Sequence, residues 1–262
     1  MGSSAVNRFA NFFNEDKYVV LKNYLYNYLL RKRAIEKCLQ PESPTLILEV
    51  GSGISPVVTN FSPTVYSDLS FEAVNILKQQ QPAGHYVVAD GMRLPFKRNR
   101  FSHIICSEVL EHVADDRQAL KEMARTLKQP HGTLIVTVPH RKCYFTNDDD
   151  FVSHYRRYEL SEIQARLRSS GLNPVQTRKV LGPLEKITMI MVVFLFTRIQ
   201  KIKAAKRSTP KRRNFRYMIL FAFFFEWANI FYKGYAWLDA VMMPRSFSSV
   251  ILVKSISGEK RR

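Results

Sequence analysis

The sequence predicts an α/β protein in which helices cover both faces of a mostly parallel β-sheet. Between residues 45 and 139, short apolar runs alternate with longer helix-like stretches. The runs are apolar at successive positions, as expected for parallel strands that are buried on both faces. Two further strand-like runs, 174–181 and 249–255, lie on either side of a long hydrophobic region. The chain therefore belongs to the α/β class, with an elaboration before its last strand.

Each predicted strand of the first group ends at a residue where a turn or a polar segment begins. The first run stops at Gly51, and the next two stop at Asp68 and Asp90. Helix-like stretches between the strands carry apolar residues at three- and four-residue spacing. The segment after Gly51 is short and contains Pro56, which predicts a truncated first helix starting near this proline. The predicted strands are 45–50, 64–68, 85–90, 101–106 and 133–138, and the predicted helices include 70–80, 114–128 and 159–170.

The N-terminal part of the chain is predicted to be an amphipathic helical segment. Within residues 9–39, apolar side chains recur at helical spacing and are followed by Arg31-Lys32-Arg33. We expect this segment to cover an edge of the core, with membrane contact as the alternative. Pro41 marks its end. The predicted organisation is an N-terminal segment 1–40, a core 41–182 plus 246–257, and a hydrophobic and basic helical insertion 183–245.

The charge balance implies an anionic partner. Lys and Arg number 40 against 22 Asp and Glu, which gives a formal net charge of +18. Such a surplus indicates either nucleic acid or an anionic membrane surface. Basic residues crowd the stretch 198–216, whereas aromatic residues gather in the apolar runs that flank it. Nucleic-acid sites interleave the two kinds of residue, so this separation favours an anionic membrane surface over nucleic acid.

The hydrophobic insertion is expected to lie in a membrane interface without crossing the bilayer. Its first apolar run, 187–196, is shorter than the roughly 20 residues that a membrane-spanning helix needs. Its second, 217–232, contains Glu226, which is costly at the bilayer centre. We expect peripheral or monotopic association with the inner face of a membrane. A soluble cap or dimer interface and a membrane-spanning segment remain as alternatives.

The cysteines favour a reducing compartment. Cys38, Cys106 and Cys143 are odd in number and scattered, without a C-x-x-C pair. This pattern argues against a disulfide framework and against a cysteine zinc site. No secretory signal is visible at the N-terminus. We therefore expect a cytoplasmic protein.

The strongest functional motif is LILEVGSGISP at residues 46–56. A strand that contains Glu49 leads into a tight Gly51-x-Gly53 turn. Glycines allow the sharp turn and the close approach of a ligand to the backbone. By itself this motif could be a simple strand-to-helix turn. Ser55 and Pro56 occupy the region of the third glycine of the dinucleotide fingerprint, which argues against a nicotinamide dehydrogenase.

Acidic residues end the next two strands and strengthen the motif. Asp68 ends the second strand, where a carboxylate can accept hydrogen bonds from ribose hydroxyls, and Asp90 ends the third. CSEVLEHV follows the fourth strand. This ordered series resembles the class I S-adenosylmethionine-dependent methyltransferases, in particular the group with quinone and small-molecule methyltransferases. The resemblance covers residues 45–181 and 249–255.

The resemblance implies a Rossmann-like seven-stranded sheet that ends in an antiparallel hairpin, with the hydrophobic insertion between its last two strands. It also implies S-adenosyl-L-methionine as the cofactor. Glu49 would contact the methionine end, directly or through water, and Gly51 and Gly53 would make room for it. The remaining cofactor-binding candidates are Asp68 and Leu69 at the ribose, Asp90, Gly91 and Met92 around the adenine, and Ser107 and Glu108 near the sulfonium.

The spacing Glu108-x-x-Glu111-His112 places three polar side chains on one helical turn. In most of the resembled family this motif packs beside the cofactor without a metal. It also resembles the metal site of small-RNA 2′-O-methyltransferases and of a quinone O-methyltransferase group, where His140 or His154 would complete the ligand set. The expectation from the sequence is that no metal is bound.

Two histidines are candidate catalytic bases for a methyl transfer to a hydroxyl. His112 and His140 each lie near the carboxyl end of a predicted strand, and the pKa of histidine is close to neutral. The alternative is that they are hydrogen-bonding pocket residues. Tyr155, Arg156 and Arg157 are candidate substrate-binding residues, because the arginines could bind a phosphate or carboxylate. Their alternative is pairing with the acidic run 148–150.

The sequence therefore favours an S-adenosylmethionine-dependent methyltransferase that acts at a membrane on a hydrophobic or lipid-linked acceptor. A prenylated quinone, a lipid or a lipid-linked glycan would fit. Two alternatives from other classes stay open. One is an RNA 2′-O-methyltransferase with a divalent metal, and the other is a non-catalytic membrane adaptor that keeps the fold.

Overall fold

A computed structural model describes residues 25–39, 45–82, 84–205 and 215–258. The part of the predicted N-terminal segment before residue 25 lies outside the described residues. A single seven-stranded sheet forms the centre of the molecule, with the strand order β3-β2-β1-β4-β5-β7-β6. Its strands are β1 (Ile47–Val50), β2 (Thr64–Asp68), β3 (His85–Val88), β4 (His103–Ser107), β5 (Thr133–Pro139), β6 (Leu172–Leu181) and β7 (Val250–Ser257).

The first five strands are parallel, and β7 pairs antiparallel with both β5 and β6. This confirms the predicted mostly parallel sheet with a terminal hairpin. The parallel register aligns Val50 with Ser67 of β2 and with Cys106 of β4. The carboxyl ends of these strands therefore meet at one edge of the sheet, which is where ligands bind in open α/β folds.

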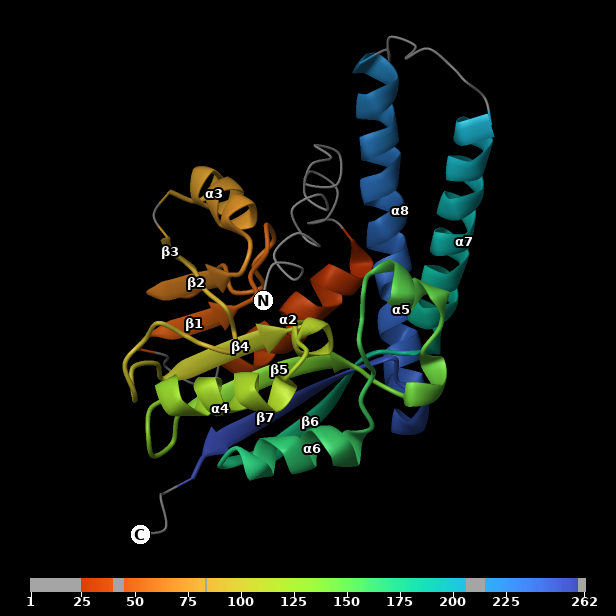
Figure 1. Cartoon of the computed structure of the whole chain (residues 1–262). Coiled ribbons are helices and arrows are strands. Elements are labelled where there is room, and N and C mark those ends of the chain that lie inside the picture. Colours follow the sequence, from red (N-terminus) through yellow and green to blue (C-terminus); the bar gives the residue numbers. More distant parts are fainter. Residues whose placement is uncertain (1–24, 40–44, 83, 206–214, 259–262) are drawn as a thin grey trace.

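Helices cover both faces of the sheet, and successive strand residues point to opposite faces. On one face, α4 (Asp116–Thr126) and α6 (Leu160–Ser169) pack on Leu48, Ile104 and Val136. On the other face, α2 (Tyr26–Leu39) packs on their neighbours Ile47, Ile105 and Ile135. The helix α3 (Phe71–Gln80) packs on β2 and β3. Figure 1 shows α4 and α6 together on the side of the sheet away from α2.

The predicted truncated helix after β1 is absent, and residues 51–63 form turns and bends. The reason lies in the Glu49 carboxylate. Its two oxygens accept hydrogen bonds from the backbone N–H groups of Val57 (2.8 Å) and Val58 (3.0 Å). Those N–H groups are bound to a side chain instead of to the carbonyls of a helical turn.

The acidic run 148–150, for which no helix was predicted, forms a short helix α5 (Asn147–Phe151). A capping box starts it: the Thr146 backbone N–H donates to Asp149 Oδ2 at 3.1 Å, and the Thr146 side chain caps the helix in return. Three 3-10 turns complete the described secondary structure. They are η1 (Leu110–His112), η2 (Lys142–Tyr144) and η3 (Arg245–Phe247).

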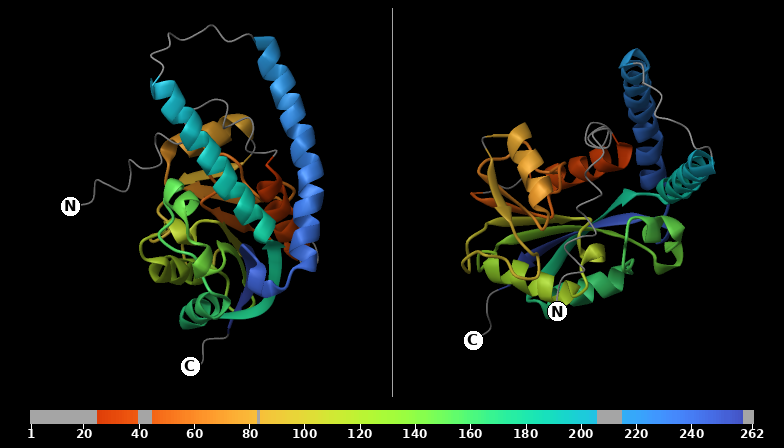
Figure 2. Two further views of the ribbon diagram at one scale, coloured as in Figure 1. Left: turned by 90° about the vertical axis from the view of Figure 1, so that its right-hand side faces the viewer. Right: turned by 45° about the horizontal axis from the view of Figure 1, so that its top comes forward.

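The hydrophobic insertion forms two long helices, α7 (Pro183–Ala205) and α8 (Phe215–Met242). They contact one another and extend away from the sheet as an arm (Figures 1 and 2). The sheet-side end of α8 packs against α2 and β6, and α7 contacts α5. None of the described helices is long and apolar enough to cross a membrane. The helical insertion predicted before the last strand is thus a hairpin of two helices.

Candidate active site

The glycine turn after β1 lies at the carboxyl edge of the sheet. The N–H groups of Gly51 and Ser52 both donate to the carbonyl of Ser67 at the end of β2 (2.7 and 3.1 Å). Gly51 has φ +71° and Gly53 has φ +53°, the left-handed region that glycine adopts without strain. A Cβ on Gly51 would also collide with the Val109 side chain. The sequence thus needs glycine here for both backbone conformation and space.

Asp68 ends β2 and faces the glycine turn. Its Oδ2 accepts a hydrogen bond from the Gly53 N–H at 2.8 Å, and its Oδ1 accepts one from the Ser70 N–H at 2.9 Å. The carboxylate is therefore fixed beside the turn. The structure brings Asp68 and Gly53 together as the resemblance implied.

The residues after β3 form a second part of the same edge. Asp90 Oδ1 accepts a hydrogen bond from the Met92 N–H at 2.8 Å, which fixes the turn that contains Gly91. A Cβ on Gly91 would meet only Val50 Cγ1, at 3.4 Å. Leu69 is 42% exposed next to Asp68. An exposed apolar side chain beside fixed carboxylates fits the ribose and adenine of a nucleoside.

Glu49 is held by contacts within the chain. Its side chain is 2% exposed and accepts hydrogen bonds from the Val57 and Val58 backbone N–H groups, as described above. Glu49 thus fixes the loop that follows Gly53, and its contact with the cofactor, directly or through water, stays a prediction. The sequence shows only an acid before a glycine turn, and the two backbone partners depend on how the loop folds back.

Ser107 and Glu108 follow β4, next to the glycine turn. Ser107 Oγ lies 2.9 Å from Thr137 Oγ1 of β5. Glu108 has φ +54°, and its Oε2 lies 3.7 Å from Arg31 of α2. Its other oxygen is buried and accepts no hydrogen bond from the described residues. The left-handed backbone at Glu108 turns the chain sharply into η1.

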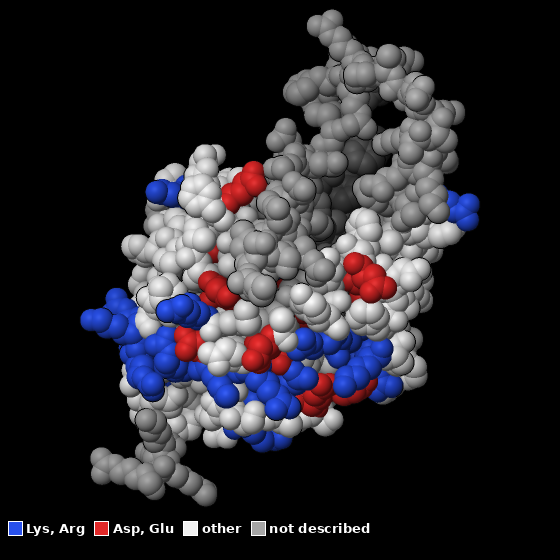
Figure 3. Space-filling model, viewed as in Figure 1, with Lys and Arg blue, Asp and Glu red and all other residues white. Residues whose placement is uncertain are grey.

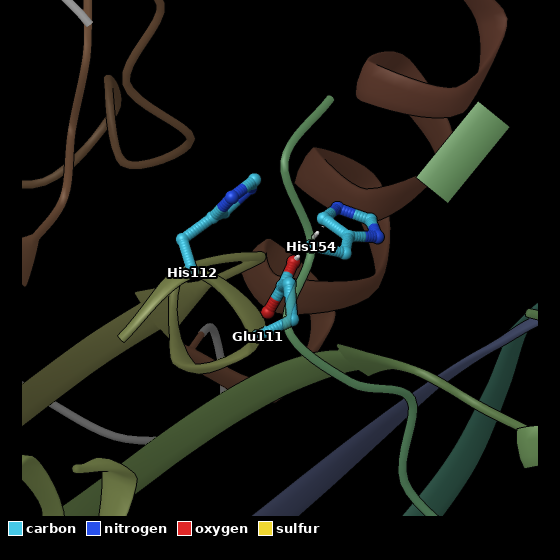
Figure 4. A group of neighbouring side chains, drawn as sticks. All are labelled: Glu111, His112 and His154. Carbon is cyan, nitrogen blue, oxygen red and sulfur yellow. Dashed lines mark ion pairs between the residues drawn. The ribbon is translucent and has the colours of Figure 1, made fainter. Parts of the chain in front are cut away.

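Three of the candidate metal ligands converge beside this turn. Atoms of Glu111, His112 and His154 that could bind a metal lie within 4.8 Å of one another (Figure 4). Glu111 is fully buried, and burial, with Glu108 nearby, raises the pKa of its carboxyl well above the usual value. Burial and the neighbouring His154 lower the pKa of His112 to about 4. His112 is therefore neutral at physiological pH.

His140 is held by structural contacts. Its side chain is 4% exposed, with Nδ1 3.0 Å from the Ser248 carbonyl and Nε2 3.9 Å from a Glu159 oxygen. Burial lowers the pKa of the ring. None of these contacts involves a residue at the glycine turn. The structure therefore favours the alternative of a pocket histidine for His140 and does not bring it to His112.

Arg156 and Arg157 also have structural partners. Arg156 lies 3.0 Å from Asp116, and the buried Arg157 donates to Asp149 Oδ1 at 2.8 Å. The Arg157–Asp149 pair matches the alternative of pairing with the acidic run 148–150, and substrate binding by either arginine stays a prediction. Tyr155 is 52% exposed and remains a candidate contact residue.

The sequence did not single out Lys186, which lies in the first turn of α7. Its Nζ donates to both Asp148 oxygens (2.7 and 2.8 Å) and to Asp149 Oδ2 (2.7 Å), and the residue is 4% exposed. A lone lysine at the start of an apolar helix is the only signal that could have indicated a buried ion pair. Its partners are more than 35 positions away along the chain.

A hollow of about 800 Å³ lies elsewhere, beside the edge strand β3. Its lining is mainly apolar and includes Phe71, Val74, Tyr86 and Phe96. None of the candidate cofactor or catalytic residues lines it. The strand-tip site is therefore separate from this hollow.

The core of the chain matches a known protein family. The family described as "Methyltransferase domain" matches residues 48–136. A demethylmenaquinone methyltransferase from Streptomyces griseus is 27% identical over 151 residues, which is 55% of this chain and 63% of the relative. An uncharacterized protein of Methanocaldococcus jannaschii is 37% identical over 123 residues, 45% of this chain and 52% of that protein. The chain thus spans less than two thirds of the length of these relatives.

Solved structures show the same fold at low identity. A methyltransferase in complex with the Haloferax volcanii Trm112 methyltransferase activator matches with a TM-score of 0.63 at 15% identity, over 99% of this chain and 100% of that one. YcgJ of Bacillus subtilis matches with a TM-score of 0.57 at 18% identity, over 87% of this chain and 98% of that one. The glycine turn, with positive φ at Gly51 and Gly53, and the fixed Asp68 carboxylate fit S-adenosylmethionine. The family match, the relatives and the fold together support a class I S-adenosylmethionine-dependent methyltransferase.

Proposed function

We propose that this protein transfers a methyl group from S-adenosylmethionine to a hydrophobic or lipid-linked acceptor at a membrane surface. Relatives named demethylmenaquinone methyltransferase occur in Streptomyces griseus and Corynebacterium glutamicum, which supports a prenylated quinone as one acceptor to test. A lipid and a lipid-linked glycan share the feature that matters, an apolar chain next to the methylated group.

The observation that carries the proposal is the position of the helical arm next to the strand-tip site. Lys186 of α7 binds Asp149, and Asp149 binds His154, which lies beside Glu111 and His112. Two ion pairs, Lys186–Asp149 and Asp149–His154, therefore connect the arm to the site. An apolar acceptor held along the arm would have a short path to the cofactor.

The surface of the arm is suited to apolar molecules. On α7, Ile187, Met191 and Phe194 are each at least half exposed, and on α8, Phe231 and Tyr235 are each 67% exposed. A contiguous apolar surface that faces solvent marks a membrane or ligand interaction site. Aromatic residues of this kind favour the boundary between headgroups and acyl chains.

The charge of the chain adds to this surface. Residues 198–205 form the end of α7 that is farthest from the sheet, and the sequence there and up to residue 216 is rich in Lys and Arg. Each basic residue near an anionic membrane adds about 1 kcal/mol of attraction. Other basic residues gather over the region of α4 (Figure 3). In the sequence of the arm, the basic stretch thus lies between two apolar runs.

The proposal is tested by incubating the purified full chain with methyl-labelled S-adenosylmethionine and a membrane lipid extract. We expect label in a lipid-soluble product, and its loss in Asp68→Ala but not in Glu72→Ala, a change of an exposed acid on α3. Label in added RNA and none in lipid would replace the proposal with the RNA methyltransferase alternative. Cofactor binding without transfer to lipid or RNA would favour the non-catalytic adaptor.

A further inference from the structure

Glu111 and His154 come from separate parts of the chain and lie side by side beside the site. Glu111 and His112 belong to the turn η1 after β4, and His154 belongs to the segment after α5. The backbone N–H of Tyr155 donates to the Glu111 carbonyl at 2.8 Å, which fixes this segment against η1. Figure 4 shows the Glu111 carboxylate beside the His154 ring, with the ring of His112 nearby. The ring centroids of His112 and His154 are 4.6 Å apart.

The Glu111 carboxylate lacks the partners that a buried acid needs. The residue is 0% exposed, and neither carboxylate oxygen accepts a hydrogen bond from another residue in the described part of the chain. The His154 Nε2 lies 3.9 Å from Oε1, too far for a hydrogen bond. Burial of such a group costs free energy unless a cation or proton compensates for it.

His154 is oriented as metal-binding histidines are. Its Nδ1 lies 2.8 Å from Asp149 Oδ1, so Nδ1 carries the proton and the lone pair of Nε2 faces Glu111. A carboxylate behind the histidine fixes the ring and increases its basicity as a ligand. Asp149 is itself held by Arg157 (2.8 Å) and Lys186 (2.7 Å). Asp149, which orients His154, is thus itself held in place by two ion pairs.

We propose that Glu111, His112 and His154 bind a divalent transition-metal ion. Two imidazoles with one carboxylate are a common ligand set for Zn²⁺ and for related ions, and three protein ligands leave a position for water or an acceptor oxygen. Mg²⁺ and Ca²⁺ prefer sites made of oxygen ligands alone. The sequence favoured the absence of a metal, and the proposed site replaces that expectation. In the proposed site, His112 is a metal ligand. The binding step does not depend on the proposed methyl transfer.

The proposal is tested by calorimetric titration of the chelator-treated full chain with Zn²⁺ and, separately, with Mg²⁺. We expect saturable Zn²⁺ binding that exceeds Mg²⁺ affinity at least tenfold. Glu111→Gln and His154→Gln should each weaken Zn²⁺ binding at least tenfold, as loss of one ligand does. His85→Gln, which removes an exposed histidine on β3, should bind like the unmodified chain.

Thermal melting distinguishes the loss of the metal site from a folding defect in a variant. Zn²⁺ should raise the melting temperature of the unmodified chain and of His85→Gln, but not of Glu111→Gln. Without metal, Glu111→Gln should melt no lower than the unmodified chain, because it removes a buried charge. Equal Zn²⁺ affinity in all variants, no saturable Zn²⁺ binding, or tighter binding of Mg²⁺ would overturn the proposal. A chain that binds Zn²⁺ but not S-adenosylmethionine would support this site and contradict the proposed function.

Discussion

Lys186 Nζ lies 2.7 Å from Asp149 Oδ2, and this contact joins the helical arm to the short helix α5. Both residues are buried, and the same lysine also binds Asp148. The arm is thus connected to the site by charge as well as by packing. Any movement of α7 relative to the sheet must either break this ion pair or move α5 together with α7.

Removal of the lysine charge should destabilise the protein. Lys186→Met leaves the Asp148 and Asp149 carboxylates buried without it, which costs about 3–5 kcal/mol. Lys78→Met, at an exposed position on α3, should change stability by less than about 0.5 kcal/mol. Denaturant unfolding of both variants measures the difference. Equal midpoints would show that the ion pair does not hold the arm.

Gly51→Ala should damage the turn more than the same change at another left-handed glycine. At Gly51 the new Cβ collides with Val109 in addition to the unfavourable φ, whereas at Gly171 (φ +80°) no atom lies within 4 Å. Gly171→Ala should cost about 1–2 kcal/mol from backbone strain alone. Gly51→Ala should cost more and lose cofactor binding. Matched unfolding curves and cofactor titrations check this, and similar losses in both variants would contradict it.

Asp116 should contribute stability that depends on pH. Burial alone would raise the pKa of its carboxyl, but hydrogen bonds from Tyr158 and Arg166 lower it below the usual value. A depressed pKa means that the folded state favours the carboxylate. The stability is therefore present above the unfolded-state pKa, and it is lost as the pH falls through the lower pKa of the folded state.

The matching variant is Asp116→Asn, which removes the charge that faces Arg156 and Arg166. We expect a loss of about 3 kcal/mol at neutral pH that shrinks below about pH 4. Asp115→Asn is the control, because Asp115 is an exposed N-cap of α4 and Asn caps equally well. Unfolding free energies measured across the acidic range test this. A loss in Asp116→Asn that stays constant with pH would contradict the assignment.

We expect the helical arm, α7 and α8, to be the part of the chain that binds to membranes. Replacement of Phe194, Trp227 and Phe231 with Ser removes exposed aromatic surface and should lower binding to anionic vesicles more than tenfold. Phe71→Ser, which removes a 72% exposed phenylalanine from α3, is the control for lost apolar surface. Vesicle flotation measures both, and binding should weaken as salt increases. Equal flotation of the triple variant and the control would exclude the arm as the contact surface.

The sequence predicted the strands well because their apolar runs report burial on both faces. The observed β2, Thr64–Asp68, coincides with its predicted bounds, and β6 begins two residues before the predicted 174–181. The short helix α5 was missed, because its capping box and its buried aspartates are stabilised by Lys186 from a distant helix. A local sequence pattern indicates which residues are buried, but it does not indicate a partner that lies far away along the chain.

The sequence predicted where the candidate site residues lie along the backbone, but not the direction of every side chain. The places of Gly51, Gly53 and Asp68 follow from strand ends in a parallel sheet. Glu49 lies where the motif puts it, but its carboxylate turns to the Val57 and Val58 N–H groups. The direction of a side chain at a strand end depends on the loop that follows, and the sequence does not specify that loop.

The central claim is that the strand tips bind S-adenosylmethionine, and calorimetric titration of the purified chain with this cofactor tests it most directly. The account predicts saturable binding that Asp68→Ala weakens by about 10- to 100-fold, as loss of charge-assisted hydrogen bonds does, while Glu72→Ala leaves it unchanged. No binding to the folded, unmodified chain, or equal binding in Asp68→Ala, would contradict the account.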